Sequence, residues 1–555
     1  MTDRRIVLGV AVLVAALLLG VSDAGAEDLR RGGGDYLVIT VDAAADALGP
    51  LVEHRRKHGL KPRVVRAQEV YEAYGKGEPS VDAIREFLRE AAKRWKPAPR
   101  FVLLVGDAVT GGPAPDGQEM LPTGIVDTYD NGPSASDNVF VAEEDSALPT
   151  LAIGRFPSSD PAVVSRLVRR SIDYEKNTDH GPWRRRLSMI AGEGRFGEAA
   201  DKAIESLATE ILSTAVPYAY DINLTYASAG SPYLYVPSKL GEKVVERLNQ
   251  GALLVNYTGH GHKDGFDRLK YKGKTYRIFT RDDLQNVNTS SRPPIVMITA
   301  CWTGCFDDPR KDAIGEALFE LEAGPVAVFA SSRVSHPFAN AVLSKEFVRS
   351  FFREREKGER PRLGELLREA KRATVENRDP QTMAIYQAGM LFLKDPKLLE
   401  KVIRDNMHLY NLFGDPALAV AYPQGADIKL DVPDAAIAGK SLRVKGKVKG
   451  LKSGTAIVSF ELARNRFAEE EEGDDDESEE ELSEDEQIER SYQLANKKAL
   501  SRVEVKIERG RFQASLDVSD ELFPGTYYVK AYVFGKDASG ATSRALPLEY
   551  PEDED

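Results

Sequence analysis

Two residues able to perform covalent catalysis follow apolar segments of this chain. Cys301 comes directly after the apolar run Ile295–Ala300, and His260 comes shortly after the run Gly251–Tyr257, with a glycine on either side. A thiolate is a far better nucleophile than a thiol, and an adjacent base promotes its formation. Because the carboxyl ends of neighbouring parallel strands meet at one edge of a sheet, we expect the two side chains to lie within reach of each other. The pair therefore predicts nucleophilic catalysis by Cys301 with His260 as its acid–base partner.

Backbone groups beside this pair could stabilise a tetrahedral intermediate. The N–H groups of Gly261 and Cys301 would face the oxyanion that develops when a carbonyl is attacked. A glycine at position 261 also permits close approach of a substrate. These groups are typical of acyl transfer.

Two neighbouring residues leave alternatives open. His262 lies two residues after His260 and could itself be the base. Cys305 could form a strained disulfide with Cys301 that inactivates the enzyme, or it could simply be buried, as free cysteines often are. Zinc could also be bound by four side chains together, those of His260, His262, Cys301 and Cys305. However, H-x-H with C-x3-C does not match the usual zinc-ribbon spacings. Two cysteines are too few for a disulfide scaffold, even in an exported protein.

The elements that must position these residues show an α/β pattern. Strands that are apolar on both faces alternate with helices expected over about 46–58 and 80–95, which indicates a parallel sheet covered on both sides. The polar residues that follow the later strands are therefore expected at one sheet edge. The predicted strands cover residues 36–41, 61–65, 101–105, 187–191, 251–257, 295–300 and 326–330.

From about Asp427 the pattern changes to short segments that alternate polar and apolar residues. These segments predict a small β-sandwich of about 120 residues, similar in size to an immunoglobulin-like domain. An acidic tract, residues 469–486, holds 14 acidic and no basic residues and falls between two of the predicted strands. We expect a self-repelling, solvated loop there, with binding of calcium or of a basic partner as the alternative. The predicted divisions are 1–26, a signal peptide; 35–180 and 185–422, two α/β subdomains; and 427–550, the β-sandwich.

The N-terminal residues predict export. Arg4 and Arg5 precede the apolar run Ile6–Gly20, and small residues follow up to Ala26, after which we expect signal-peptide cleavage. An uncleaved anchor is the alternative, but the run is short of the roughly 20 residues that span a membrane. No later segment is long and apolar enough to span one. The expected location is outside the cytoplasm, secreted, periplasmic or on the cell surface, without stable membrane insertion after cleavage.

The overall charge argues against a nucleic-acid partner. The net charge is -12, and without the acidic tract the remainder sums to +2. Nucleic-acid binding calls for a concentrated basic face, which this near-neutral remainder does not indicate.

Several sequence blocks resemble the gingipain family of cysteine peptidases. An apolar strand followed by His-Gly, and another followed by Ala-Cys, is a signature shared with caspases, legumains and clostripain. The blocks more specific to gingipains span roughly residues 36–422, and they are Asn256–Gly261, Ala300-Cys301, Ile153–Phe156 and Phe413–Leu418. Ser136-Asp137-Asn138 resembles a further block, to which no chemistry is assigned. The resemblance implies a caspase-like α/β catalytic region in two subdomains, followed by an immunoglobulin-like domain.

The same resemblance implies roles for individual residues. The family's histidine falls on His260, its nucleophile on Cys301, and its oxyanion donors on the backbone of Gly261 and Cys301. Glu193 matches a glutamate that orients the histidine, and a carboxylate there would fix the imidazole tautomer. Its alternative is an exposed loop glutamate.

Substrate-binding residues align less closely with the family. Glu198 or Asp201 falls near the acid that selects a basic side chain in arginine-specific gingipains, but both could equally be charges on a helix surface. Trp302 and the pair Asp307-Asp308 differ from the familiar sequence after the nucleophile. The pocket that binds substrate is expected to differ in shape accordingly.

Together these features predict an exported cysteine endopeptidase that cleaves protein or peptide substrates through an acyl-enzyme on Cys301. A preference for basic residues before the cleaved bond is one expectation. No cofactor is required for this chemistry, and calcium is considered only as a structural ion. The alternatives are a non-catalytic binding scaffold of the same fold, against which the presence of both Cys301 and His260 argues, and a secretion-associated processing peptidase.

Overall fold

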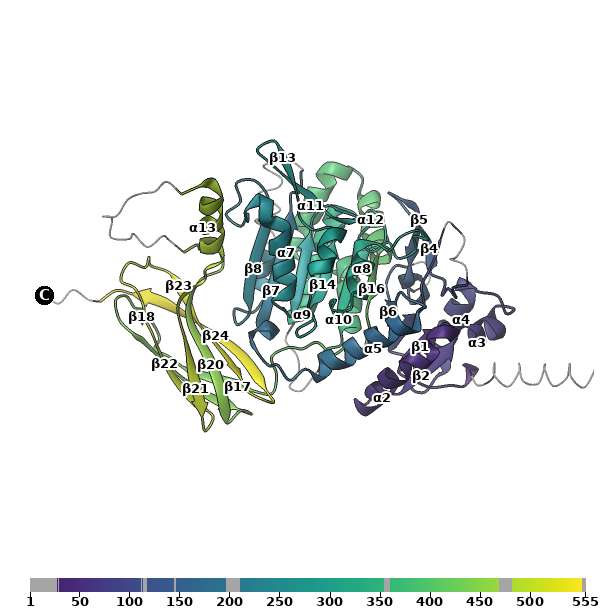
Figure 1. Cartoon of the computed structure of the whole chain (residues 1–555), viewed down its shortest axis with the longest axis horizontal. Helices are drawn as coiled ribbons and strands as arrows, with labels where there is room; N and C mark the ends of the chain where they lie inside the picture. Colours follow the sequence, from purple (N-terminus) through teal and green to yellow (C-terminus); the bar gives the residue numbers. More distant parts are fainter. Residues whose placement is uncertain are drawn as a thin grey trace, which may run out of the picture.

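The computed structural model describes residues 27, 29–110, 112, 117–143, 146–195, 210–353, 360–468 and 482–551. The predicted signal peptide, Glu198, Asp201 and residues 469–481 of the acidic tract lie outside these described residues. In Figure 1 an α/β region occupies the centre, its N-terminal helices lie at one end, and a β domain lies at the other end, beside strand β8.

A ten-stranded sheet forms the centre of the described α/β region, in the order β2-β1-β3-β6-β16-β15-β14-β9-β7-β8. Neighbouring strands are parallel, except that β16 runs antiparallel to β15. The strands before that reversal therefore run opposite to those after it. The bounds are β1 Tyr36–Thr40, β2 Pro62–Arg66, β3 Phe101–Val105, β6 Ala152–Phe156, β7 Arg186–Gly192, β8 Asp221–Ala227, β9 Leu254–Thr258, β14 Ile295–Thr299, β15 Ala327–Ser331 and β16 Tyr410–Phe413.

This reversal decides which strand ends meet. The strands β7, β9, β14 and β15 are mutually parallel, so their carboxyl ends lie at one edge, as the sequence predicts. The carboxyl ends of β3 and β6 lie at the opposite edge. One edge of the sheet therefore brings together the segments after β7, β9, β14 and β15.

The sheet is buried on both faces. Ile295 and Met297 of β14 belong to one hydrophobic cluster, whereas Val296 and Ile298 belong to another. Since successive side chains of a strand point to opposite faces, each face of the sheet packs against its own core. The covering helices are α2 Gly49–Lys57, α3 Ala67–Tyr74, α4 Val81–Arg94, α5 Pro161–Lys176, α7 Leu240–Asn249, α8 Ile314–Glu320, α9 Pro337–Phe352, α10 Leu363–Glu376, α11 Pro380–Leu393 and α12 Pro396–Leu409.

The predicted helices differ in how closely they match. Helix α4 agrees with the prediction over 80–95, and the side chain of Ser80 caps it by accepting a hydrogen bond from the amide of Ala83. The helix expected from about 46 to 58 is present as α2, but it begins later, at Gly49, after a 3-10 helix over Asp42–Leu48. The start falls there because Pro50 lacks an amide hydrogen and fits only the first turn of a helix.

The C-terminal region is an all-β domain with its own hydrophobic core. Its eight-stranded sheet has the order β17-β19-β22-β21-β20-β23-β24-β18. Burial alternates residue by residue along β19, which is the pattern of a strand with one face on a core. The predicted fold class, a parallel-dominated α/β region followed by an all-β unit, is confirmed. The bounds are β17 Asp427–Asp431, β18 Ala436–Ile437, β19 Leu442–Lys449, β20 Ser453–Leu462, β21 Ala499–Glu508, β22 Arg511–Leu516, β23 Thr526–Phe534 and β24 Ser539–Glu549.

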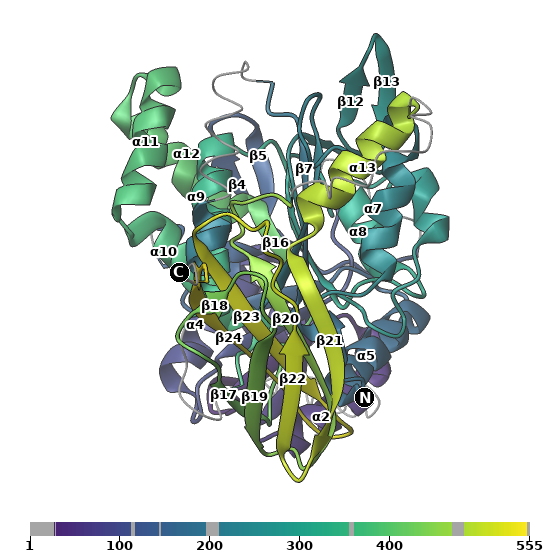
Figure 2. The same ribbon diagram turned by 90° about the vertical axis from the view of Figure 1, so that its left-hand side faces the viewer.

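The expectation of a loop over the whole acidic tract is wrong at its C-terminal end. Residues 484–486 form the first turn of α13 (Glu484–Asn496), where Ser483 and Glu486 make a capping box. Acidic residues are favourable at this position because the N-terminus of a helix carries partial positive charge. Figure 2 shows α13 standing beside the α/β region, and the side chain of Asn496 there bonds both backbone groups of Leu224 in β8. Helix α13 thus covers part of β8, the strand at one edge of the large sheet.

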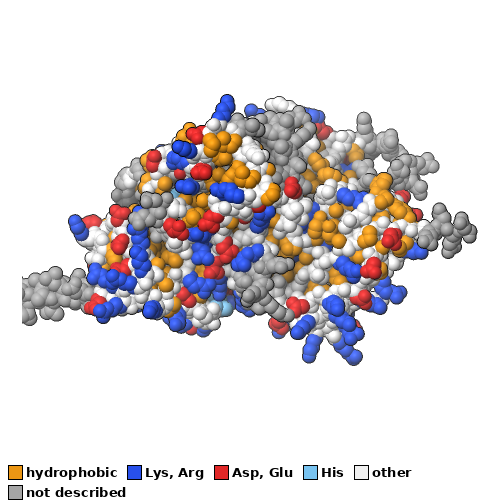
Figure 3. Space-filling model, turned by 180° about the vertical axis from the view of Figure 1, so that it is seen from behind, with side chains coloured by type: hydrophobic (Ala, Val, Ile, Leu, Met, Phe, Trp, Pro, Cys, Tyr) orange, Lys and Arg blue, Asp and Glu red, His pale blue; other side chains and the backbone are white. Residues whose placement is uncertain are grey.

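None of the described helices is long and apolar enough to cross a membrane. On the face shown in Figure 3, basic and acidic side chains are interspersed, with hydrophobic side chains in separate groups between them. The charges on this face are mixed in sign.

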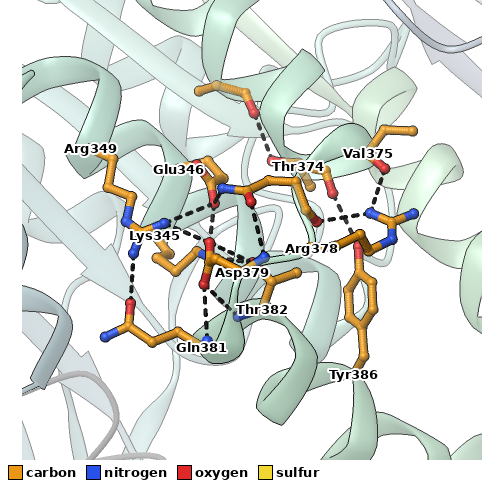
Figure 4. Close-up of polar contacts among 12 residues, drawn as sticks. Lys345, Glu346, Arg349, Thr374, Val375, Arg378, Asp379, Gln381, Thr382 and Tyr386 are labelled. Atoms are coloured by element: carbon orange, nitrogen blue, oxygen red, sulfur yellow. Dashed lines mark hydrogen bonds and ion pairs between the residues drawn. The ribbon is translucent and has the colours of Figure 1, made fainter.

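A buried polar cluster joins α9 to α11 (Figure 4). The ammonium group of Lys345 is fully buried and lies 2.6 Å from the carboxylate of Asp379, which also lies 2.6 Å from the guanidinium of Arg349. The same carboxylate accepts hydrogen bonds from two amides in the first turn of α11. Although burial opposes ionisation, the hydrogen bonds from Lys345, from a helix amide and from Arg349 hold the pKa of Asp379 well below its usual value.

We expect Asp379→Asn to lower the free energy of unfolding at pH 7 by about 3 kcal/mol, because it leaves Lys345 buried without this counter-charge. A carboxylate whose pKa is lowered by folding stabilises the protein above its unfolded pKa of about 4, and this contribution is lost as the pH falls through the folded pKa. The difference between variant and wild type should therefore shrink at pH 3. Chemical denaturation at both pH values measures it.

Asp395→Asn is the matched control, since Asp395 caps α12 without an ion pair among the described residues. Asparagine caps helices as well as aspartate, so this change should cost about 0.5 kcal/mol or less. Equal losses in the two variants would show that the ion pairs of Asp379 contribute nothing.

Candidate active site

His260 and Cys301 occupy equivalent positions on adjacent strands. Thr258 of β9 pairs with Thr299 of β14, and each of the two residues lies two positions beyond this pair. The segments that carry them are in contact, since a Cβ atom on Gly261 would lie 2.8 Å from the carbonyl oxygen of Cys301. Only glycine fits at position 261, so the turn after β9 can pack directly on the turn after β14.

The imidazole of His260 is oriented by the backbone after β7. Its Nε2 lies 3.0 Å from the carbonyl oxygen of Gly194. A carbonyl oxygen only accepts, so Nε2 must carry a proton and donate it. In the neutral ring the lone pair then resides on Nδ1.

Tyr257 holds the backbone of the same turn. It is fully buried, and its hydroxyl donates a hydrogen bond of 2.7 Å to the carbonyl oxygen of His260 while accepting one of 3.2 Å from the amide of Asp267. Its ring stacks on Phe266 with a centroid distance of 3.7 Å. The sequence placed Tyr257 within a family block, but its role in positioning His260 depends on contacts with β11 (Gly265–Phe266) that no local pattern reveals.

We expect Tyr257→Phe to lower kcat/KM by about tenfold while costing only about 1 kcal/mol of stability, because the stacked ring remains and one pair of hydrogen bonds is lost. Peptide hydrolysis and thermal unfolding measure the two effects. Tyr276→Phe is the matched control, since the hydroxyl of Tyr276 bonds no described residue, and an equal loss of activity there would contradict the positioning role.

The sulfur of Cys301 receives a hydrogen bond from the segment after β15. The amide of Ser335 donates to Sγ over 3.3 Å. The amide of Cys301 itself has no acceptor within the described part of the chain. It is thus available to donate to a substrate oxyanion.

A buried polar network supports Ser335. Asn340 donates to the Ser335 hydroxyl over 2.9 Å, and its own carbonyl oxygen accepts from Tyr410 at 2.9 Å and from Asn406 at 2.7 Å. No sequence pattern indicated this network, because Asn340, Asn406 and Tyr410 come from three different elements. The only local signal was the polar run after the apolar residues of β15.

The N-terminal half of the chain also braces this segment. Asn131, between β4 (Gly124–Thr128) and β5 (Gly132–Ser136), donates to the carbonyl oxygen of Val334 at 3.0 Å and accepts from its amide at 2.9 Å. This pair of bonds fixes the backbone immediately before Ser335. The site is therefore built from both halves of the sheet.

Trp302 and Cys305 belong to a charged cluster in the segment after the nucleophile. Trp302 has a backbone φ of +63°, and its ring centroid lies 5.1 Å from the ammonium of Lys263 and 5.4 Å from the guanidinium of Arg333. Arg333 also pairs with Asp307 at 2.5 Å and approaches the sulfur of Cys305 at 3.2 Å. Both cysteines are free thiols and Cys305 is buried, so the alternative of burial is confirmed. Burial raises the pKa of Cys305 to about 12, which leaves it unreactive.

The zinc alternative finds no support in the geometry. His262 is exposed in β10 (Gly261–His262), whereas Cys305 is buried beside Asp307. Within the described ranges, no group of three or more His, Cys, Asp or Glu side chains is placed to hold a metal ion.

The predicted acidic site residues have a mixed outcome. Glu193 follows β7 directly, and its carboxylate lies 3.9 Å from Arg195. The hydrogen bond to the imidazole of His260 is instead made by the carbonyl oxygen of the next residue, Gly194. The role of Glu193 in orienting His260 stays a prediction. Glu198 and Asp201 lie outside the described residues, so their role in substrate selection also stays a prediction.

Three of the sequence blocks contribute side chains to buried ion pairs. Arg155, in the block Ile153–Phe156, pairs with Asp137, in the block Ser136-Asp137-Asn138, through two contacts of 2.8 Å. Asp415, in the block Phe413–Leu418, pairs with Arg55 at 2.6 Å. All four of these side chains are buried, and they join distant parts of the α/β region rather than the catalytic edge.

Comparison with known proteins identifies relatives of this chain. A profile of Peptidase family C25 matches residues 30–421. Gingipain R2 of Porphyromonas gingivalis is 23% identical over 314 residues, which are 55% of this chain and 37% of that protein. Gingipain R1 of Porphyromonas gingivalis is also 23% identical over 314 residues, which are 28% of its length. The chain thus spans about a third of the length of these curated relatives.

Solved structures show the same fold. The crystal structure of the Arg-specific cysteine proteinase gingipain R (RGPB) has a TM-score of 0.52 at 18% identity, covering 94% of this chain and 98% of that one. A complex of the pro- and mature domains of RgpB from Porphyromonas gingivalis has a TM-score of 0.52 at 17% identity, covering 93% and 100%.

The described fold, a parallel-dominated α/β region followed by an all-β unit, is that of the solved gingipain structures. The chain belongs to Peptidase family C25, and its resemblance to gingipains is confirmed.

Proposed function

We propose that this chain is an active cysteine endopeptidase that hydrolyses peptide bonds through an acyl-enzyme on Cys301. The single observation that carries the proposal is the matched placement of His260 and Cys301, two residues beyond the paired Thr258 and Thr299. A binding scaffold of the same fold would have no need of a backbone amide that donates a hydrogen bond to the Cys301 sulfur, or of a backbone carbonyl that selects the histidine tautomer.

In the proposed mechanism the Cys301 thiolate attacks the scissile carbonyl carbon, and the negative charge moves to the carbonyl oxygen. The amides of Cys301 and Gly261 donate to this oxyanion. The C–N bond then breaks as protonated His260 gives its Nδ1 proton to the leaving amine, which leaves a thioester on Cys301. His260 next takes a proton from water, whose oxygen attacks the thioester and releases the new carboxyl group and the thiolate.

We further propose that the substrate carries a basic residue before the cleaved bond. The support is the similarity to a proteinase described as Arg-specific. The family resemblance also places Glu198 or Asp201 near an acid that selects a basic side chain. The reaction uses only protein groups and needs no cofactor. We also propose export outside the cytoplasm, with cleavage after Ala26.

Labelling with a peptidyl electrophile tests the function. A chloromethyl ketone with arginine next to the reactive group should modify the wild-type protein once, on the peptide that contains Cys301, and should leave the Cys301→Ala variant unmodified. Slower labelling by the corresponding alanine probe would support basic specificity. Equal labelling of wild type and variant would refute the mechanism, and a protein that no probe modifies and that cleaves no peptide in a library would indicate the scaffold alternative.

A further inference from the structure

A β hairpin from the N-terminal half of the chain lies beside the segment that holds Cys301. Its strands β4 and β5 form a separate two-stranded sheet among the described residues, and the turn between them runs from Tyr129 to Asn131. In Figures 1 and 2 the hairpin lies toward the same end of the large sheet as β13 (Lys274–Arg277), which follows His260 in the chain. The hairpin therefore belongs to the surface around the catalytic edge.

The turn of the hairpin is linked to the nucleophile through two short steps. Asn131 bonds both backbone groups of Val334, and the next residue, Ser335, donates its amide to the sulfur of Cys301 over 3.3 Å. These links, together with ordinary backbone dimensions, place Tyr129 roughly 20 Å or less from that sulfur. An extended polypeptide covers this distance in about six residues.

The backbone of the turn is fixed, whereas the side chain of Tyr129 stays exposed. The amide of Tyr129 donates to the carboxylate of Asp405 in α12 over 2.8 Å. The side-chain amide of Asn131 donates to the hydroxyl of Thr128 over 3.1 Å, and this hydroxyl also bonds that of Ser134 across the hairpin. Because the turn is already ordered, a partner that buries the tyrosine ring does not have to order the backbone that carries it.

Large apolar side chains are exposed at three places in the described α/β region, and two of the three are on this hairpin. Tyr129 is 55% exposed and Ile125 of β4 is 48% exposed, while the third residue is Met383 of α11. Ile125 and Tyr129 are four residues apart, so an extended chain lying along the hairpin meets both. Tyrosine is frequent among the residues that anchor interfaces.

We infer that the hairpin β4–β5 is a substrate-binding surface, which takes an aromatic or branched apolar side chain of an extended polypeptide within about six residues of the cleaved bond. The inference rests on the proposed function of Cys301 and adds to it a specificity separate from the basic residue before the bond. The occupant is the substrate because the surface is continuous with the catalytic edge through Asn131 and Val334. Contact with Ile125 and Tyr129 removes apolar surface of both partners from water.

Hydrolysis of a matched peptide series by the full chain tests the inference. Each peptide carries an arginine before the cleaved bond and one phenylalanine, placed two to six positions from the bond on either side, with alanine elsewhere. The best of these peptides should have a kcat/KM at least about fivefold above that of the peptide without phenylalanine, through a lower KM. Tyr129→Ala should bring this ratio close to one, Ile125→Ser should lower it less, and Tyr129→Phe should keep it.

Phe523→Ala is the matched control for the loss of an exposed aromatic ring. Phe523 is 56% exposed but belongs to the β domain, so its replacement should keep the wild-type ratio. Thermal unfolding of each variant checks the fold, which these changes at exposed positions should leave intact. A ratio that is unchanged in Tyr129→Ala, or that falls equally in Phe523→Ala, would overturn the inference. So would a wild-type ratio close to one at every position of the phenylalanine.

Binding of the same peptides to Cys301→Ala separates this test from that of the proposed function. Fluorescence anisotropy of labelled peptides should show tighter binding of the phenylalanine peptide, and adding Tyr129→Ala to this variant should abolish the difference. Binding that depends on Tyr129, without any cleavage by the wild type, would contradict the proposed function and retain the surface. Cleavage that is indifferent to Tyr129→Ala would contradict the surface and retain the proposed function.

Discussion

Cys301→Ala should reduce peptide hydrolysis by at least about 10⁴-fold while leaving the fold intact. The other described thiol, Cys305, is buried, so the variant retains only substrate binding and oxyanion donors. The small change in a half-buried side chain should alter stability little. Steady-state hydrolysis of a peptide substrate, with thermal unfolding of the same samples, measures both quantities.

Cys305→Ala is the control from the same segment. Its sulfur is buried against Arg333 and Asp307, so we expect a loss of stability of about 1–2 kcal/mol and a change in kcat/KM of less than about twofold. If Cys305→Ala abolished hydrolysis while Cys301→Ala did not, the nucleophile would be assigned to the wrong cysteine. Comparable losses in both variants would point to a disulfide or a shared structural role.

His260→Ala is expected to lower kcat by about 10²–10⁴-fold, which is the usual contribution of a positioned acid–base group. The loss should be larger for an amide substrate than for a substrate whose leaving group needs no proton, such as a nitrophenyl ester. That difference follows because His260 is expected to protonate the leaving amine. Comparing amide and ester substrates of the same peptide therefore separates proton donation from substrate positioning.

His262→Ala provides the matched control for the histidine. His262 is exposed and its imidazole makes no hydrogen bond or ion pair with the described part of the chain, so activity should change by less than about twofold. A larger loss in His262→Ala than in His260→Ala would mean that the base is assigned to the wrong histidine. Equal losses would show that neither ring acts alone.

Local sequence patterns predicted most strands of the large sheet because those strands are apolar on both faces. The run Phe101–Val105 matches β3 residue for residue, and Ile295–Ala300 exceeds β14 by one residue. Boundaries shifted where a strand continues past its apolar residues. For example, β7 extends to Gly192 because its backbone still pairs with β8 there.

Predictions failed where distant contacts override local composition. The end of the acidic tract is helical because Tyr492 and Asn496 of α13 bond Thr225 and Leu224 of the large sheet. Charge density alone gave no indication of that contact. The reversal of strand direction at β16 likewise has no local signal, although it places the ends of β3 and β6 at the edge opposite the catalytic pair.

Residue type and apolar periodicity are local properties, so the amino-acid sequence alone predicted that a cysteine and a histidine each follow a buried strand. That β9 and β14 are neighbours, in a register that matches His260 with Cys301, follows from the packing of the whole sheet. The same packing chooses the groups that orient the two residues, since Gly194 lies 66 residues from His260 and Ser335 lies 34 residues from Cys301. Such partners are chosen by the packing of whole elements on both faces of the sheet, which no short window of sequence contains.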